Sequence, residues 1–319
     1  KNKKINIYNN FNNLNKILRD KVDYTMNSIV GIEGLIPTIK IIKFTKKIAI
    51  ANKETIICAW NLIKKELKKN NTEFIPIDSE HFSINELIKF QKNKQIKKII
   101  ITASGGPFLN KKNKKKIKIH EALKHPTWKM GKKISIDSST LMNKVFEVIE
   151  AKKIFNLQIN KIAVLINPNS YLHAIVVFKN GTIKMLVHET SMDIPIYNSL
   201  YNVNYNNAYN TKFLDLNKIN NLNLSKPNTK YFKTLKLLKL IPDKNSLFET
   251  ILISINDKLV EMFLNEQITY KKLLIYLNKI IKFKIFEKYS RLKPKSINDI
   301  VKANTLAKTF VKEYVRNKN

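Results

Sequence analysis

Two acidic residues follow a short apolar segment at residues 74–77, which the pattern predicts to be a strand. The residues that come next are Asp78, Ser79 and Glu80. In an extended chain, side chains two positions apart point to the same side, so Asp78 and Glu80 are expected to converge while Ser79 points away. Two convergent carboxylates suit a hard cation such as Mg²⁺ or Mn²⁺, particularly if a third carboxylate joins them. A solvated strand end carries the same pattern, and the fragment alone leaves both interpretations open.

The stretch from His125 to Ala151 reads HPTWKMGKKISIDSSTLMNKVFEVIEA and contains a second set of polar groups. Residues 134–136 alternate as a half-buried strand does, and the Asp-Ser-Ser cluster at 137–139 predicts a helix start. From Leu141 onward, the apolar residues recur at helical spacing. We therefore expect a loop, a short strand and a helix, in this order.

The opposite face of that helix carries Asn143, Lys144, Glu147 and Glu150. They form one polar stripe, because residues three and four apart are neighbours on a helix. Hydroxyls and backbone N–H groups at a helix start, followed one turn later by an amide and an ammonium, could hold a phosphate group. The alternative is an amphipathic helix with a solvated polar face, which is a common arrangement.

Three loops beside apolar segments could also carry function. The Asn-Lys-Glu sequence at 52–54 follows a strand predicted at 48–50, where functional groups of parallel sheets gather, although a helix cap with solvated charges explains it as well. The Ser-Gly-Gly turn at 104–106 follows another apolar strand and could expose backbone N–H groups to an anion. Trp128 lies in a polar loop, where so large an apolar side chain is either an anchor or a lid over a ligand.

The order of the predicted elements indicates an α/β fold. Helices are expected within 31–42 and after the strand at 48–50, and this alternation of strands and helices is typical of a mostly parallel sheet. From about Ile241 to the end of the chain, the pattern is helical.

The composition points away from several classes of protein. The 319 residues are 44% hydrophobic, which is typical of a globular chain. The formal net charge of +35 suggests a polyanionic partner, but Lys and Asn are spread over nearly every segment, as codon drift toward A and T would produce. We therefore do not favour a nucleic-acid partner.

The single cysteine, Cys58, excludes an internal disulfide and a cysteine-based metal site. No apolar run approaches the roughly 20 residues that cross a bilayer, so no membrane partner is expected. The six glycines form no G-x-G-x-x-G motif for a dinucleotide. The first residue is Lys and no signal-peptide pattern follows, so we expect the chain to be a piece of a longer protein.

Taken together, these segments resemble the 1-deoxy-D-xylulose 5-phosphate reductoisomerase family. The matching motifs occur in the family's order and cover most of residues 29–265; they are GIEGLIPT (31–38), IAIANKET (48–55), IPIDSEH (75–81), SGGPF (104–108), the stretch 125–151 and, more weakly, INDKLVEMFL (255–264). The resemblance implies an oxidoreductase that uses NADPH and a divalent cation, Mg²⁺ or Mn²⁺. Its phosphorylated sugar substrate would be converted to 2-C-methyl-D-erythritol 4-phosphate for isoprenoid synthesis by the non-mevalonate pathway.

The resemblance also implies roles for individual residues. The carboxylates that hold the cation match Asp78, Glu80 and Glu147. The groups that bind the substrate phosphate match Ser104, Ser138, Asn143 and Lys144. Further substrate contacts match Ser79, Lys53, His125 and Trp128, the last two on a loop that closes over the substrate, together with Glu147. Catalytic contributions are expected from Lys53, Glu80 and His125. The cofactor side matches Asn52, Lys53, Glu54 and Gly131.

Two segments depart from the family pattern. The family's His-Pro-Gln-Ser motif appears as Asn-Pro-Asn-Ser at 167–170, so Asn167 stands where we expect an active-site imidazole. The family's Gly-x-Pro-Asp-Met-Arg run appears as HETSMD at 188–193. The alternative function is therefore a degenerate relative that binds phosphorylated sugars with weak turnover. A nucleic-acid-binding protein on a recruited scaffold is less favoured.

The family comparison predicts the domains of the chain. Residues 1–77 would be the later part of a Rossmann-like NADPH-binding domain without its first strand and glycine-rich loop, so we expect no NADPH affinity from this chain alone. Residues 78–213 would form an α/β catalytic domain, 214–240 a connector and 241–319 a C-terminal all-helical domain. A homodimer in the bacterial cytoplasm is expected, with a plastid-type organelle as the alternative location.

Overall fold

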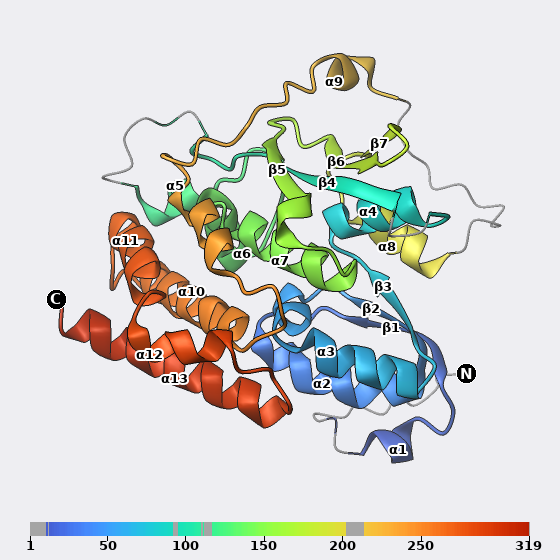
Figure 1. The fold of residues 1–319 in the computed structure, drawn as a ribbon, viewed down its shortest axis with the longest axis horizontal. Coiled ribbons are helices and arrows are strands. Elements are labelled where there is room, and N and C mark those ends of the chain that lie inside the picture. The colour runs from blue at the N-terminus through green and yellow to red at the C-terminus, as the bar shows by residue number, and fades with distance from the viewer. Residues whose placement is uncertain are drawn as a thin grey trace, which may run out of the picture.

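The computed structural model describes residues 11, 13–91, 95–109, 111, 117–201 and 214–318, which form two β-sheets and a group of C-terminal helices (Figure 1). The first sheet is parallel, with the strand order β1-β2-β3. Its strands are β1 (Val22–Asn27), β2 (Thr45–Ile50) and β3 (Glu73–Pro76). The strands predicted at 48–50 and 74–77 are therefore confirmed. The sequence analysis missed β1, because its sequence mixes polar and apolar residues and only Asn27 in it is buried.

Helices α2 (Leu35–Ile41) and α3 (Lys53–Lys69) lie beside each other against this sheet (Figure 1). Asn52 begins α3, because its side-chain oxygen accepts a hydrogen bond of 2.8 Å from the backbone N–H of Thr55. The amide of the same side chain donates to the backbone oxygens of Ile29 and Gly31. Asn52 is thus a helix cap that also ties the end of β2 to the glycine turn before α2.

The second sheet is mixed, with the strand order β5-β4-β6-β7. Its strands are β4 (Ile96–Ala103), β5 (Ile162–Ile166), β6 (Leu172–Phe178) and β7 (Ile183–Val187). β4 pairs parallel with β5 and antiparallel with β6, and β6 pairs antiparallel with β7. The mostly parallel arrangement that we expected holds for the first sheet only. A short turn with Gly181 at a φ of 85° reverses the chain between β6 and β7 and makes that pair antiparallel.

Helices α4 (Ser79–Ile88) and α7 (Met142–Ile154) pack on the second sheet. Ile84 of α4 and Val148 of α7 share a fully buried apolar cluster with Ile99 of β4. This packing brings the first turn of α4 next to the polar stripe of α7, although the two helices are far apart in the sequence.

The strand that we predicted at 134–136 is wrong, because these residues lie within helix α6 (Lys132–Ser139). An alternation of three residues is too short to distinguish a strand from one buried side of a helix. The helix start predicted at 137–139 is also wrong, because α6 ends at Ser139. The chain then turns at Leu141, whose φ is 58°, and α7 begins at Met142.

The C-terminal region is helical, as predicted from about Ile241 onward. Its elements are α10 (Phe248–Leu264), α11 (Tyr270–Ile280), α12 (Lys284–Glu287), η6 (Lys288–Ser290) and α13 (Ile297–Arg316). Helix α10 is buried along most of its length and packs against α13, α11, α3 and α6. The apolar core of this region is therefore continuous with the core beneath the first sheet.

The remaining short elements connect these layers. They are α1 (Leu14–Ile17), η1 (Ile32–Gly34), η2 (Ile42–Phe44), α5 (Ile119–Leu123), η4 (Ile159–Lys161), α8 (Asp193–Leu200), α9 (Leu216–Asn220) and η5 (Lys233–Leu240). Within the described part of the chain, no helix has the length and apolar character that crossing a membrane requires. The boundary predicted at residue 213 lies outside the described residues.

Candidate active site

A cavity of about 240 Å³ lies where strands of both sheets end. Ala51 follows β2, Asp78 follows β3 and Ser104 follows β4, and all three line the cavity. Helix α7 closes another side with Asn143 and Lys144. Open α/β sheets bind ligands at the carboxyl ends of their strands, so this cavity is the expected place for a substrate.

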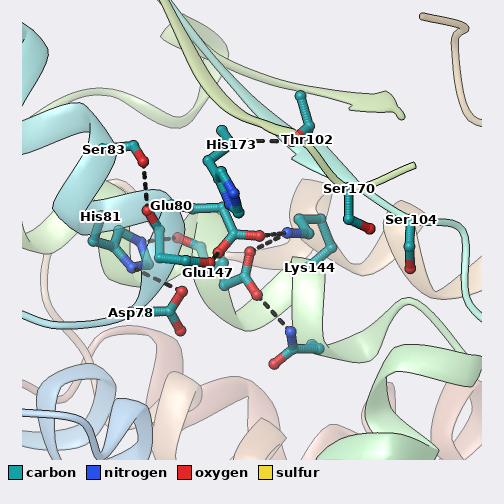
Figure 2. A network of polar contacts seen from close by, with 12 residues as sticks. Asp78, Glu80, His81, Ser83, Thr102, Ser104, Lys144, Glu147, Ser170 and His173 are labelled. Atoms are coloured by element: carbon teal, nitrogen blue, oxygen red, sulfur yellow. Dashed lines mark hydrogen bonds and ion pairs between the residues drawn. The ribbon is translucent and has the colours of Figure 1, made fainter. Parts of the chain in front are cut away.

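Three carboxylates converge on one side of the cavity (Figure 2). One oxygen atom from each of Asp78, Glu80 and Glu147 lies within 4.8 Å of the other two. The reason we gave for the convergence of Asp78 and Glu80 is wrong, because the chain is not extended there. Asp78 precedes α4, Glu80 lies in the first turn of that helix, and Ser79 donates a hydrogen bond of 2.6 Å to Glu80 instead of pointing away.

Two ammonium groups face these three carboxylates. Lys144 Nζ lies 2.6 Å from Glu80 Oε1 and also contacts Glu147. Lys53 Nζ lies 2.6 Å from Asp78 Oδ2 and 3.6 Å from Glu147 Oε1. Burial raises the pKa of Glu147 to about 8, and the neighbouring Glu80 carboxylate adds to the increase against the ammonium of Lys144. Burial alone would raise the pKa of Glu80, but the Lys144 ammonium and the hydrogen bonds of Glu80 with Asp78, Lys144 and Ser79 together outweigh burial and lower the pKa.

This donor set fits a hard divalent cation. The three groups offer carboxylate oxygens, which Mg²⁺ and Mn²⁺ prefer. Three carboxylates face only two ammonium groups, so one negative charge is uncompensated when all three acids are ionised. The site therefore has the ligand type and the surplus negative charge that a metal site needs, and the binding of a metal by this triad stays a prediction.

A buried histidine, His81, lies beside Asp78 (Figure 2). His81 is fully buried, and its Nε2 donates to the backbone oxygen of Glu147 at 2.9 Å. Its Nδ1 lies 3.8 Å from Asp78 Oδ1 and 3.5 Å from Glu150 Oε2. Burial raises the pKa of Glu150 to about 7, against the opposing effect of His81. We did not predict a role for His81 or Glu150, although Glu150 lies on the same helical stripe as Glu147 and His81 follows Glu80 directly.

The residues expected to bind phosphate lie on the same cavity. Ser104, Ser138, Asn143 and Lys144 all line it. Gly106 has a φ of 66°, and a Cβ atom there would lie 2.8 Å from the backbone oxygen of Ser138. The glycine turn after β4 can therefore approach the end of α6 only because it lacks side chains. This close approach brings Ser104 and Ser138 to one cavity.

His125 holds the loop that carries Trp128. Its Nδ1 accepts hydrogen bonds from the backbone N–H groups of Thr127 and Trp128, at 3.2 and 3.0 Å. Its Nε2 lies 3.0 Å from Ser104 Oγ and is left to donate, since Nδ1 accepts. Burial lowers the pKa of His125 to about 4, with a further contribution from the Lys144 charge, so the imidazole is neutral at pH 7. Trp128 lines the cavity beside His173, at 6.1 Å between ring centroids.

The second wall of the cavity contains a pair of histidines that the sequence analysis missed. The rings of His173 and His188 are stacked, with centroids 3.6 Å apart and planes at 11°. His173 lines the cavity and donates from Nε2 to the backbone oxygen of His188 at 3.1 Å. Burial lowers the pKa of both histidines, so the stacked pair is uncharged. No sequence signal joins them, because they come from β6 and from the segment that follows β7.

Asn167 does not line the cavity. It is fully buried outside the cavity lining, where its side-chain oxygen accepts from the backbone N–H of Leu172 at 3.3 Å and its amide donates to the backbone oxygen of Leu222. In this structure the side chain braces two loops, and its match to an active-site imidazole of the family stays a prediction. Ser170 of the same motif does line the cavity.

Three residues expected on the cofactor side do not line this cavity. Asn52 and Glu54 are buried, and their side chains bind the glycine turn before α2 and Lys133, respectively. Gly131 is exposed at the start of α6. Lys53 is the one member of this set that lines the cavity.

Family profiles match most of the chain. Residues 1–60 match 1-deoxy-D-xylulose 5-phosphate reductoisomerase, residues 74–155 match the C-terminal domain of this enzyme, and residues 188–310 match a further DXP reductoisomerase C-terminal domain. The curated 1-deoxy-D-xylulose 5-phosphate reductoisomerase of Pelagibacter ubique is 53% identical over 308 residues, which are 95% of this chain and 79% of that protein. The enzyme of a Sulfurihydrogenibium species is 40% identical over 299 residues, or 92% and 77% of the two chains.

Solved structures give the same relationship. A DOX-P reductoisomerase in complex with NADPH, fosmidomycin and magnesium superposes with a TM-score of 0.83 and 31% identity, over 92% of this chain and 76% of that one. The 1-deoxy-D-xylulose 5-phosphate reductoisomerase of Zymomonas mobilis in complex with NADPH gives a TM-score of 0.82 and 27% identity, over 96% and 78%.

Proposed function

The chain belongs to the 1-deoxy-D-xylulose 5-phosphate reductoisomerase family, and from this membership we propose a role for each group in the cavity. The reaction is the conversion of 1-deoxy-D-xylulose 5-phosphate to 2-C-methyl-D-erythritol 4-phosphate in isoprenoid synthesis, with NADPH and a divalent cation. The chain is thus an NADP-dependent oxidoreductase. The observation that carries the assignment of roles is the convergence of three carboxylates beside the cluster of Lys144, Ser104 and Ser138.

In this proposal, Asp78, Glu80 and Glu147 hold the cation. When bound, the cation polarises the substrate ketone and acidifies a hydroxyl group, and NADPH supplies the hydride that reduces the rearranged aldehyde. The arrangement of α4 against α7 fixes the three carboxylates before the substrate arrives. The carboxylates therefore need little reorganisation during the reaction, and such preorganised charges stabilise a transition state effectively.

Lys144, Ser104, Ser138 and Asn143 bind the substrate phosphate in this proposal. Lys144 is only 4% exposed and supplies a positive charge at the bottom of the cavity, while the two serine hydroxyls can donate to phosphate oxygens. A phosphate held there is remote from the reacting carbons and contributes binding energy that orients the rest of the substrate.

Lys53 and Ser79 would contact the hydroxylated chain of the substrate. The Lys53 ammonium already lies 2.6 Å from Asp78 and 2.8 Å from the side-chain oxygen of Asn143, so it stands between the proposed metal and phosphate positions. Burial alone would lower the pKa of Lys53, but the nearby Asp78 and Glu147 carboxylates raise it, so Lys53 acts as a fixed positive charge and not as a base. Glu80 contributes to catalysis through the cation.

His125 and Trp128 would close the cavity over the substrate. The neutral His125 donates from Nε2 toward Ser104 and accepts two backbone N–H groups of its own loop, so one ring couples the loop to the phosphate end. Closure of the loop would exclude water from the reactive aldehyde. Asn52, Glu54 and Gly131 would contribute to the NADPH site, which would then lie outside this cavity.

The proposed domains follow the two sheets. Residues 1–77 would belong to the NADPH-binding part, 78–213 to the catalytic part and 241–319 to the helical part, with 214–240 as the connector. A homodimer is also proposed, because the edge strand β7 exposes Ile183 and Met185 at 62% and 53%. Sedimentation equilibrium would test it. The bacterial relatives suggest a cytoplasmic location for the protein.

The test of the reaction is the oxidation of NADPH, measured by its absorbance, with 1-deoxy-D-xylulose 5-phosphate and Mg²⁺ or Mn²⁺. The assay uses the full-length protein, because we expect no NADPH affinity from this chain alone. Turnover that requires both the sugar phosphate and the cation is the expected result. Binding of a phosphonate without any turnover would instead indicate the degenerate relative, for which the changed segment at 188–193 is the specific observation.

A further inference from the structure

A buried charge cluster lies just outside the cavity, and none of the roles proposed above explains it. We call it the Lys133 junction; it consists of Lys133, Glu54, Asp137 and Asp257. Lys133 Nζ contacts Glu54 Oε1 and lies 3.2 Å from Asp137 Oδ2 and 3.1 Å from Asp257 Oδ1. The side chains are only 22%, 7%, 3% and 13% exposed, in that order.

The junction joins three helices from different parts of the chain. Glu54 lies in the first turn of α3, Lys133 and Asp137 lie on α6, and Asp257 lies on α10. A fourth helix, α7, contributes the ring of Phe146, whose centroid is 5.6 Å from the ammonium. Asn256 of α10 adds a hydrogen bond of 2.7 Å to Asp137 Oδ1. One ammonium thus holds α3 and α10 against α6.

The members of the junction are chain neighbours of cavity residues. Glu54 follows Lys53, Lys133 precedes Ile134, and Asp137 precedes Ser138; Lys53, Ile134 and Ser138 all line the cavity. Because neighbouring residues of one helical turn move together, the contacts of Lys133 fix the direction in which Lys53 and Ser138 enter the cavity. The junction thus includes the helical turn that carries Lys53 and the turn that carries Ser138.

We propose that Lys133 is a positioning residue for the reaction, which holds the turns that carry Lys53 and Ser138 in the geometry that binds the sugar phosphate. This inference rests on the proposed substrate contacts of Lys53 and Ser138. The surplus of carboxylates explains why a lysine is needed at this position, since removal of the ammonium leaves three buried acids that repel one another. Burial raises the pKa of Asp257 to about 7 against the ammonium of Lys133, and the charges of Glu54 and Asp137 add to the increase.

The test compares Lys133→Met and Lys133→Arg with the matched control Lys132→Met. Lys132 is the exposed neighbour on the same helix and has no place in the junction. Each variant is made in the full-length protein. Its kcat and its KM for 1-deoxy-D-xylulose 5-phosphate are measured at saturating NADPH, at a temperature well below the unfolding midpoint. We expect Lys133→Met to raise the KM by on the order of tenfold relative to Lys132→Met, because small displacements of positioning groups weaken a bound geometry strongly. Lys133→Arg should recover most of the affinity, since it restores the charge.

A lower unfolding midpoint of Lys133→Met with a KM equal to that of Lys132→Met would overturn the inference and leave a structural role only. If Lys133→Met does not fold, Glu54→Gln replaces it. This variant keeps an oxygen acceptor for Lys133 and should raise the KM by about threefold, since only the charge-assisted part of the contact is lost. An unchanged KM in Glu54→Gln would equally overturn the inference. Lys53→Met is measured in parallel: if it leaves the KM unchanged, the proposed substrate contact fails, independently of Lys133.

Discussion

Lys53 donates a hydrogen bond of 2.8 Å to the side-chain oxygen of Asn143, although the two residues are 90 positions apart in the chain. Lys53 begins α3 beside the parallel sheet, and Asn143 lies in the first turn of α7 beside the mixed sheet. The contact therefore joins the two sheet units at the cavity. It also explains how the first residue of the helix after β2 and a polar stripe on a distant helix become parts of one site.

Glu147→Gln should abolish tight divalent-cation binding. The substitution keeps the shape of the side chain but removes one of the three converging carboxylates, the one that contacts Lys144. We expect the affinity for Mn²⁺ in isothermal titration calorimetry to fall by about a hundredfold, at the upper end of the effect known for changes around metal sites. Glu86→Gln, a partly exposed position on α4, serves as the control and should bind as the parent chain does. Equal affinities in the two variants would show that the metal lies elsewhere.

Lys144→Ala should weaken the binding of a phosphonate substrate analogue. A charged hydrogen bond of this kind contributes about 1.5–3 kcal/mol, which corresponds to a loss of affinity of roughly ten- to a hundredfold. Calorimetry with saturating Mg²⁺ measures the change, and Lys98→Ala, at an exposed position on β4, is the charge-matched control. A phosphonate affinity that is the same in both variants would contradict the phosphate role of Lys144.

The sequence predicted the strands and helices that have a strong local pattern. Strands β2 and β3 have clear apolar runs, and the capping residue Asn52 precedes the long apolar stripe of α3. It failed where the pattern was short or mixed, as in α6 and β1. The formation of α6 and of β1 depends on packing against other elements, and the sequence of a single segment does not reveal this packing.

For the candidate site, the sequence identified those residues that belong to recognisable motifs. The resemblance placed Asp78, Glu80 and Glu147 together, and the structure brings their oxygens within 4.8 Å. It could not show that His173 stacks on His188, because this contact depends on the antiparallel pairing of β6 with β7. The same limit explains Asn167: the motif indicated a change of chemistry, whereas tertiary contacts made this residue a loop brace.

Trp128 should report ligand binding by its fluorescence. The chain has two tryptophans, of which Trp60 is buried beside Phe74 and Trp128 lines the cavity. We expect a phosphonate with Mg²⁺ to change the emission of the parent chain, because the indole environment changes when the loop closes. Trp128→Phe should abolish the change and Trp60→Phe should retain it. A signal that survives in Trp128→Phe would show that the loop does not close over the ligand.

Asp257→Asn should stabilise the protein at neutral and basic pH. Burial raises the pKa of Asp257 from 3.8 to about 7, against the opposing ammonium of Lys133, so the folded state prefers the protonated acid. A raised acid pKa gives stability that is fully present below pH 4 and is lost as the pH rises through 7. The neutral amide avoids this loss. Its advantage should therefore be near zero below pH 4 and on the order of 2–4 kcal/mol at pH 8, measured by urea unfolding. The exposed control Asp243→Asn should stay within about 0.5 kcal/mol at both pH values. A destabilised Asp257→Asn at pH 8 would show that the ionised carboxylate is a net stabilising partner of Lys133.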